Sequence, residues 1–312
     1  MKQKISVVIS AFNEEAMIED CLKSVKDLAD EIIFVDNSSS DDTVKIAKKY
    51  TDKIFIRENN PVNLNINKNF GISRATGDWI ISLDADERLT PELAREIKKA
   101  ALDKNFNGYD IPRKNIIFGK WIEHSIWWPD YNLRLFRRGK GKFAARHVHE
   151  KLTVDGEVGK LENPMVHYNY QTVSQFINKL NKTYTESETE NFLSSGKSLY
   201  WFDAIRWPVA DFVKTFFLER GYKDGLHGLV LSLFQAFYAL VFFAKVWEKK
   251  ENFKDLFVAD RVIASEKQSI FLQEVIRELQ KAGRDIRYWI YETLIDQSRA
   301  KKIYYKIRRK LK

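Results

Sequence analysis

Cysteine is almost absent from this 312-residue chain, in which Cys21 is the only one. A single thiol excludes an intrachain disulfide and a thiol-ligated metal cluster, so nothing in the sequence indicates an oxidising compartment. We also find no secretory signal peptide, because the first predicted strand begins at Ile5 and leaves no room for a basic and then an apolar segment. We therefore expect a cytoplasmic protein.

No segment is predicted to span a membrane. The main candidate, residues 228–244, is uncharged but has only 17 residues, whereas a spanning helix needs about 20. Basic residues concentrate near the end of the chain, where residues 277–312 contain 12 Lys or Arg and four Asp or Glu. An apolar helix beside a positive tail favours contact with an anionic membrane surface. The alternative is a buried helical hairpin followed by a solvated basic helix.

Short apolar runs alternate with amphipathic helices in the first hundred residues. The predicted strands cover residues 5–9, 32–35, 54–56 and 79–83, and the predicted helices cover 16–25, 44–50, 65–75 and 91–102. This alternation predicts a doubly wound, mostly parallel α/β sheet, in which ligands bind at the carboxyl ends of the strands.

The pattern changes after residue 102. Strand-like pieces follow at residues 109–113, 116–118, 131–136 and 147–154, and from residue 173 onward the pattern is helical. We predict three parts: a nucleotide-binding and catalytic domain at 1–170, an aromatic-rich helical region at 171–250 and a basic helical tail at 251–312.

Carboxylates follow the apolar run 79–83 directly, as Asp84, Asp86 and Glu87. If the extended conformation continues for one residue past the strand, Asp84 and Asp86 point to the same side. Two adjacent carboxylates favour a hard divalent cation. The alternative is a solvated acidic turn that caps the next helix, and we place Glu87 in a supporting or helix-capping role.

Three motifs in order make the first half recognisable. They are Val7 to Glu15, Val35 to Thr43, and Gly71 to Gly77 leading into Leu83 to Asp86. Together they resemble the family 2 glycosyltransferases of GT-A fold over residues 1–160. Asp130 to Arg138, Val148 to Glu150, Gly221 to Gly225 and Lys245 to Glu248 are similar to the lipopolysaccharide-core β-1,4-glucosyltransferase subgroup.

The resemblance implies a site for a nucleotide-sugar donor, most simply a UDP-sugar. Asp36 would accept hydrogen bonds from the base or ribose, and Ala11, Asn13 and Glu15 would line the same pocket. Asp84 and Asp86 match the D-x-D pair, which implies Mg²⁺ or Mn²⁺ bound to the donor diphosphate.

Cationic side chains are candidates for the diphosphate. Lys68 and Arg134 would contact phosphate oxygens, because a diphosphate keeps several unneutralised oxygens after one metal has bound. For both residues the alternative is a solvated surface position.

The resemblance also implies inversion at the anomeric carbon, so a base must take the acceptor proton. A carboxylate is the ordinary choice, and we expect Glu150 in this role, with Asp130 as the second candidate. His149 is expected to orient Glu150 or to contact the donor diphosphate or its metal. A zinc site formed by His147, His149 and His167 is an alternative.

The predicted function is an inverting, non-processive, metal-dependent transfer of a hexose to a lipid-linked saccharide such as lipopolysaccharide core. One sugar per acceptor is expected, because the Q-x-x-R-W motif of processive members is missing at residues 203–207. The expected location is peripheral, on the inner face of the plasma membrane. The alternatives are a sugar nucleotidyltransferase, against which the glycine-free segment 10–15 argues, and a basic nucleic-acid- or membrane-binding protein without catalysis.

Overall fold

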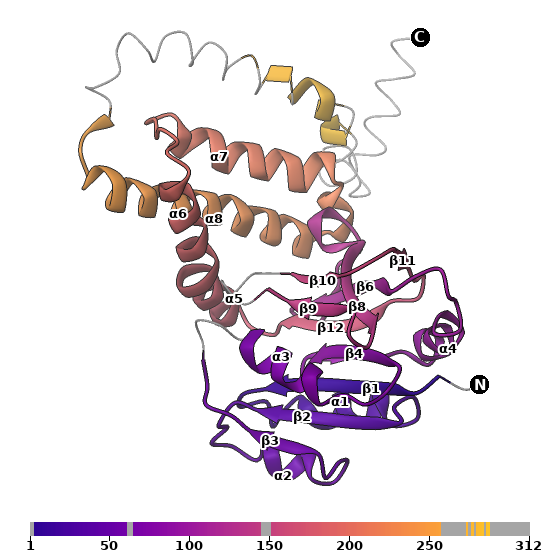
Figure 1. The fold of residues 1–312 in the computed structure, drawn as a ribbon. Coiled ribbons are helices and arrows are strands. Elements are labelled where there is room, and N and C mark those ends of the chain that lie inside the picture. The colour runs from indigo at the N-terminus through magenta and orange to yellow at the C-terminus, as the bar shows by residue number, and fades with distance from the viewer. Residues whose placement is uncertain are drawn as a thin grey trace, which may run out of the picture. The chain divides into compact units, whose positions relative to one another are not determined.

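The computed structural model describes residues 3–60, 65–144 and 151–256, and eleven further positions between 273 and 287. The chain divides into two compact units. Unit 1 contains Met1–Ile117 and Trp128–Asn169, and unit 2 contains Phe118–Trp127 and Tyr170–Lys312. Each unit is described by itself below (Figure 1).

Unit 1 is built on one large mixed sheet. Its strands are β1 (Ile5–Ala11), β2 (Glu31–Asp36), β3 (Ile54–Ile56), β4 (Trp79–Asp84), β5 (Glu87–Arg88), β6 (Gly108–Ile117), β8 (Asp130–Arg137), β9 (Gly141–Phe143), β10 (Leu152–Val154), β11 (Val158–Lys160) and β12 (Met165–Tyr170). Its helices are α1 (Ile18–Val25), α2 (Thr43–Ala47), α3 (Asn65–Arg74) and α4 (Pro91–Ala100). The strand order is β3-β2-β1-β4-β8-β6-β12-β5, with β9 and β10 forming a separate hairpin.

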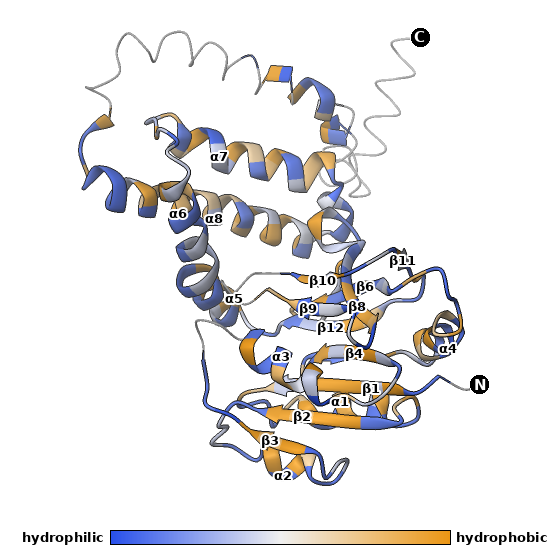
Figure 2. Ribbon diagram, viewed as in Figure 1, coloured by the Kyte–Doolittle hydropathy of each residue, from blue (hydrophilic) through white to orange (hydrophobic). Residues whose placement is uncertain are grey.

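The predicted α/β fold is confirmed. Strands β1 to β4 pair in parallel, and β8 then joins β4 in the antiparallel direction. The apolar strands β1, β2 and β3 are orange in Figure 2. Side chains on one face of the sheet pack against α1 and α4, and those on the other face pack against α3 and the β9–β10 hairpin. The sheet is therefore covered on both faces, as a parallel sheet requires.

Strand β6 differs from the prediction. The sequence predicted two pieces at 109–113 and 116–118, whereas β6 runs unbroken as Gly108–Ile117, with a register shift between Tyr109 and Asp110. Pro112 and Asn115 interrupt the apolar pattern without ending the strand. Only residues 152–154 of the predicted strand 147–154 are a described strand, because residues 147–150 lie outside the described part.

Helix α3 approaches the sheet closely because it carries a glycine at the contact. A Cβ added at Gly71 would lie 2.6 Å from Val8 Cγ1 and 2.9 Å from Val35 Cγ2. Both distances are shorter than a carbon–carbon contact allows, so a larger residue would push α3 outward. This close packing fixes Lys68, one turn earlier on α3, relative to the end of β4.

Unit 2 is mainly helical. Its elements are β7 (Lys120–Trp121), η1 (Ser125–Trp127), α5 (Val173–Lys179), η2 (Leu180–Tyr184), α6 (Thr185–Ser194), α7 (Asp203–Phe212), η3 (Val213–Leu218), η4 (Gly221–Asp224) and α8 (Leu226–Glu251). Two aromatic-rich clusters form its interior, one around Phe216 and the other around Phe243. The predicted helical C-terminal region is thus present.

Glu31 ties together the amino-terminal ends of β1 and β4. Its carboxylate accepts hydrogen bonds from the hydroxyl of Ser6, from the backbone N–H of Thr76 at 2.6 Å and from Lys53. Burial raises the pKa of Glu31, but the hydrogen bonds from Lys53, Ser6 and Thr76 outweigh burial and hold the pKa at about 2. The ionised form is therefore the one that stabilises the fold.

We predict that Glu31→Gln destabilises the protein in a pH-dependent way. Because the folded-state pKa lies below the unfolded-state value of about 4.3, the charge contributes stability above pH ~4 that is lost as the pH falls toward 2. The free energy of unfolding should fall by roughly 1 to 2 kcal/mol at pH 7. Urea unfolding of parent and variant from pH 7 to pH 2.5 measures this difference, and a difference independent of pH would contradict it.

Candidate active site

Two loops interlock at the carboxyl ends of β1 and β2. The backbone N–H of Asn13 donates to Ser39 Oγ at 2.9 Å, and the backbone N–H of Ser40 donates to Asn13 Oδ1 at 2.8 Å. Glu15 Oε2 accepts a hydrogen bond from the backbone N–H of Asp42 at 3.0 Å. The side chains of Asn13 and Glu15 are thus both bonded to the backbone of the neighbouring loop.

Asp36 ends β2 and is almost fully buried, with 1% of its surface exposed. Its Oδ2 accepts a hydrogen bond from the backbone N–H of Ser39 at 2.8 Å, whereas its buried Oδ1 has no hydrogen-bond partner among the described residues. A buried carboxylate oxygen without a donor is costly. The backbone carbonyl of Ala11, by contrast, is an acceptor with partners, because it accepts hydrogen bonds from the N–H and the side-chain amide of Asn37, both at 2.9 Å.

Asp84 ends β4 between two cations. Lys68 Nζ lies 2.5 Å from Asp84 Oδ1, and an Arg134 guanidinium nitrogen lies 2.7 Å from Asp84 Oδ2. Burial raises the pKa of Asp84, but Lys68 and Arg134 outweigh burial and hold that pKa well below its usual range. Asp84 therefore remains a carboxylate, and neither Lys68 nor Arg134 is a solvated surface cation.

Glu87 lies at the centre of the charge cluster, with none of its surface exposed. One carboxylate oxygen accepts from Arg134 at 2.7 Å and lies 3.7 Å from an Arg113 nitrogen, and the other accepts from the backbone N–H of Asp84 at 3.0 Å. Burial lowers the pKa of Arg134, but Glu87 and Asp84 outweigh burial and hold that pKa above its ordinary value. The helix-capping alternative for Glu87 is wrong, because Thr90 caps α4.

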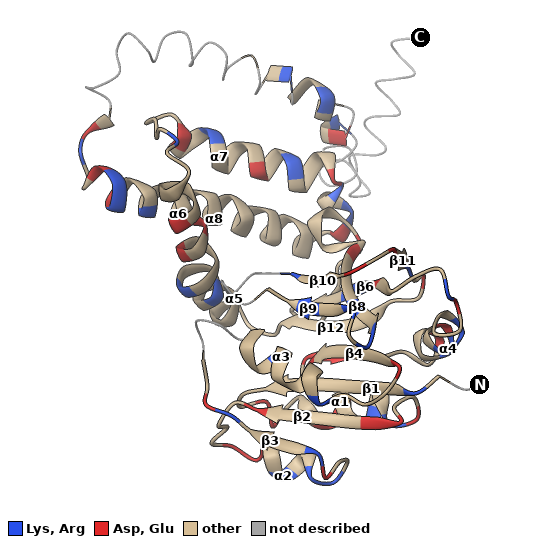
Figure 3. Ribbon diagram, viewed as in Figure 1, with Lys and Arg blue, Asp and Glu red and all other residues tan. Residues whose placement is uncertain are grey.

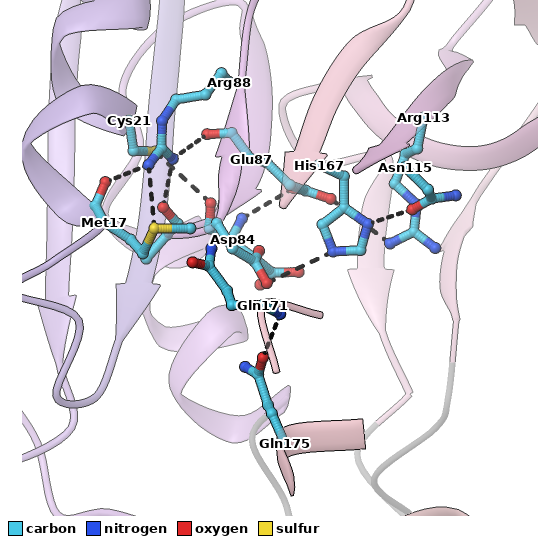
Figure 4. Close-up of polar contacts among 12 residues, drawn as sticks. Met17, Cys21, Asp84, Glu87, Arg88, Arg113, Asn115, His167, Gln171 and Gln175 are labelled. Atoms are coloured by element: carbon cyan, nitrogen blue, oxygen red, sulfur yellow. Dashed lines mark hydrogen bonds and ion pairs between the residues drawn. The ribbon is translucent and has the colours of Figure 1, made fainter. Parts of the chain in front are cut away.

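Asp86 faces a different set of partners. Residues 85–86 form a turn, so the extended conformation does not continue past Asp84. His167 Nε2 lies 3.5 Å from Asp86 Oδ2, and His167 Nδ1 lies 2.6 Å from Asn115 Oδ1 (Figure 4). Because an amide oxygen only accepts, Nδ1 must carry a proton. Nε2 of the neutral ring is then an acceptor, so only the doubly protonated ring donates to Asp86.

Asp130 is held by the strand beside it. Arg113 stands opposite Asp130 in the β6–β8 register, and its guanidinium lies 2.6 Å from Asp130 Oδ2. The same oxygen accepts from Asn115 at 3.1 Å, and Oδ1 accepts from Asn132 at 2.9 Å. Both carboxylate oxygens are thus already engaged by side chains of the protein, so Asp130 stays the second candidate.

The remaining predicted residues lie outside the described part of the chain. They are His147, His149 and Glu150. Of the three histidines of the alternative zinc site, His167 alone is among the described residues. Sequence reasoning gave no role to Arg113 or Asn115, and only the pairing of β6 with β8 reveals them.

The donor set fits one hard divalent cation that also binds a diphosphate. Among the described residues, no group of three or more His, Cys, Asp or Glu side chains can hold a metal ion. Mg²⁺ usually takes one or two carboxylates and fills its other positions with water and substrate phosphate. Asp86 is the better protein ligand, because Asp84 already has Lys68 and Arg134 as partners.

Comparison with known proteins agrees with this geometry. The family model described as glycosyl transferase family 2 matches residues 6–153. An uncharacterized glycosyltransferase of Rickettsia typhi is 30% identical over 275 residues, which cover 84% of this chain and 92% of that protein. This chain belongs to the family 2 glycosyltransferases. Membership decides against the sugar nucleotidyltransferase alternative.

Other relatives of this glycosyltransferase have more specific names. The lipopolysaccharide core biosynthesis glycosyltransferase LpsC of Rhizobium meliloti is 27% identical over 80% of this chain and 93% of that protein. A crystal structure of glucosyl-3-phosphoglycerate synthase from Mycobacterium tuberculosis, with Mn²⁺, UDP-glucose and phosphoglyceric acid, is 25% identical over 36% of this chain and 44% of that chain, with a TM-score of 0.31.

We predict that Glu87→Gln costs the glycosyltransferase about 3 kcal/mol of folding stability, because it leaves the buried Arg134 and the partly buried Arg113 short of one negative charge. Guanidinium unfolding monitored by circular dichroism measures the loss. Glu92→Gln is the matched control, because the Glu92–Arg95 pair is exposed on α4 and should change stability by less than about 0.5 kcal/mol. Equal losses in the two variants would refute a central role for Glu87.

Proposed function

We propose that this family 2 glycosyltransferase moves one hexose, with inversion, from a UDP-sugar to a lipid-linked saccharide such as lipopolysaccharide core. The observation that carries the proposal is the cluster at the carboxyl ends of β2 and β4. There Asp36 has a buried acceptor oxygen without a partner in the described part of the chain, and Asp84 lies between two cations, both within the region that the family 2 model matches.

Asp36 is proposed to bind the nucleoside. Its buried Oδ1 accepts a hydrogen bond from a ribose hydroxyl or from the N–H of uracil, both of which are neutral donors. The interlocked loops containing Asn13 and Glu15 keep their shape through backbone hydrogen bonds, which supports a preformed pocket wall there, with Ala11 at its base. Preformed walls reduce the ordering cost of binding.

Arg134 and Lys68 are proposed to bind the donor diphosphate. Arg134 remains anchored through Glu87 when Asp84 shares its charge with another cation, so the guanidinium keeps its orientation. Lys68 has a flexible stem and adjusts its ammonium group to a phosphate oxygen. Lys68 and Arg134, which both contact Asp84, can thus each contact a phosphate oxygen with little rearrangement.

Asp86, with Asp84 beside it, is proposed to hold Mg²⁺ or Mn²⁺ on the diphosphate. A bound divalent cation supplies charge that stabilises the departing nucleotide diphosphate. The contacts of His167 with Asn115 and Asp86 keep the Asp86 carboxylate oriented. His149 remains a proposed contact to the diphosphate or its metal.

Glu150 is proposed to take the proton from the acceptor hydroxyl as the donor bond breaks. The alternative, Asp130, is engaged by Arg113, Asn115 and Asn132, which occupy both of its carboxylate oxygens. Inversion follows if the base activates the acceptor on the face opposite the leaving diphosphate. No processive motif accompanies this site, so one sugar is added per acceptor.

The proposed acceptor is lipid-linked because the relative LpsC acts in lipopolysaccharide core biosynthesis, as its name states. Such an acceptor is anchored in a bilayer, so we propose a cytoplasmic enzyme that binds peripherally to the inner face of the plasma membrane. The basic terminal segment suits the negative charge of that surface.

We predict that Asp86→Ala weakens UDP binding in the presence of Mn²⁺ by at least about tenfold, because the metal loses a protein ligand. Isothermal titration calorimetry with UDP, with and without Mn²⁺, measures this effect. Asp155→Ala, which removes an exposed carboxylate paired with Lys140, should bind like the parent. If Asp86→Ala binds UDP and Mn²⁺ as well as the parent, the metal assignment is wrong.

We predict that Glu150→Gln retains UDP and Mn²⁺ binding but transfers sugar about 10² to 10⁴ times more slowly, because the base is lost and the shape is kept. Transfer of radiolabelled glucose from UDP-glucose to deep-rough lipopolysaccharide measures the rate. Glu157→Gln, an exposed position, is the matched control. Parent-like turnover in Glu150→Gln would remove this residue as the base and make Asp130→Asn the next test.

A further inference from the structure

Helix α8 (Leu226–Glu251) has two apolar faces. One face packs into unit 2 through buried side chains that include Leu231, Ala239 and Val246. The other face is exposed, with Leu226, Leu233, Phe237 and Leu240 leaving 73%, 50%, 45% and 43% of their surface open. The spacing of seven, four and three residues places these four side chains along one stripe, named here the exposed stripe.

The exposed stripe is too apolar for a surface that faces water alone. Between Asp224 and Lys245 the sequence contains no Asp, Glu, Lys or Arg, and the middle of α8 is free of charged residues in Figure 3. By length and composition α8 is apolar enough to cross a membrane, with a mean hydropathy of 1.9 over its best window. Only 28% of that window is buried, whereas a core helix of a soluble protein is mostly buried.

The contacts of α8 exclude a spanning orientation. A Cβ added at Gly228 would lie 1.8 Å from the backbone oxygen of Gly221, so α8 and η4 touch through their backbones. Helix α7, which carries Asp203, Arg206 and Asp211, packs along α8. If α8 crossed a bilayer, these charged side chains would enter the hydrocarbon region with it, and such side chains are rare and costly there.

Basic side chains lie near both ends of α8. Lys223 is exposed just before α8, and Lys249 and Lys250 are exposed in its last turn, where Lys249 pairs with Glu186 and where Glu248 and Glu251 also lie. The sequence beyond residue 276 adds further Lys and Arg in excess of Asp and Glu. An apolar stripe with basic ends matches the chemistry of an anionic lipid surface, which offers acyl chains below negative headgroups.

We propose that α8 docks in the plane of an anionic bilayer, with Leu226, Leu233, Phe237 and Leu240 inserted below the headgroups. The proposal rests on the proposed function, because a lipid-linked acceptor requires the enzyme to work at a bilayer surface. It goes beyond that function by naming the docking face and by excluding a transmembrane orientation.

Depth measurement with spin labels tests the orientation. Leu226→Cys, Leu233→Cys and Leu240→Cys are each labelled with a nitroxide in the full chain and bound to vesicles of phosphatidylglycerol and phosphatidylcholine. Native Cys21 does not interfere, because it is fully buried and burial raises its thiol pKa to about 12. Leu102→Cys, at a position 60% exposed in unit 1, is the control that should stay in water.

The expected result is one common depth just below the headgroups for all three labels. A spanning helix would instead separate the labels at 226 and 240 by about 21 Å along the membrane normal, and this result would overturn the in-plane proposal. Labels that remain in water with vesicles present would overturn docking itself. Labels that are shielded before vesicles are added would show that the terminal tail or a second copy covers the stripe, which also overturns it.

A binding measurement separates this proposal from the proposed function. The double variant Leu233→Glu/Phe237→Glu should lose at least about tenfold in vesicle affinity by sedimentation, whereas Leu102→Glu should bind vesicles like the parent. Both variants should bind UDP like the parent by calorimetry, because neither touches the nucleotide site. Parent-like vesicle affinity in the double variant would refute docking and leave the sugar-transfer proposal intact. If the parent binds vesicles but does not bind UDP, the sugar-transfer proposal fails and the docking of α8 stands.

Discussion

The buried ion pair between Glu87 and Arg134 is the interaction on which unit 1 depends. Arg134 comes from β8, and Glu87 comes from β5, which pairs with β12 in the antiparallel direction at the end of the strand order, so their contact joins two strands that are not neighbours in the sheet. Two ions removed from water lower the free energy only if nearly every hydrogen bond is made. Asp84, Arg113 and the backbone of residue 84 supply further partners, and the buried Nε of Arg134 has no hydrogen-bond partner among the described residues.

That ion pair also explains why the acids after β4 have different roles. Glu87 points into the protein and holds two guanidinium groups, Asp84 shares one of them with Lys68, and Asp86 faces His167 across the turn. A turn at residues 85–86 therefore separates three carboxylates that are adjacent in the sequence. Asp84 and Glu87 share the Arg134 guanidinium, which limits the repulsion between these two carboxylates.

Sequence patterns predicted the elements whose signal is local. The alternation of apolar runs and amphipathic helices predicted β1 to β4 and α4, and the acids after the fourth run predicted a charged site there. Contacts that depend on strand pairing could not be predicted from the sequence. Arg113 and Asp130 are 17 residues apart and meet because β6 and β8 pair with Arg113 opposite Asp130, and no periodicity in the sequence encodes that register. The partner of Glu87 could not be predicted for the same reason, since Arg134 lies 47 residues away.

The ion pair between Glu87 and Arg134 also constrains how sequences of this family can diverge. Glu87 and Arg134 hold the fold together and also orient the proposed diphosphate site, so a substitution at either position harms folding and activity at once. Among the described residues, Asp86 carries no comparable share of the buried charge cluster. We therefore expect relatives that have lost catalysis but still fold to keep Glu87 and Arg134 and to vary at Asp86.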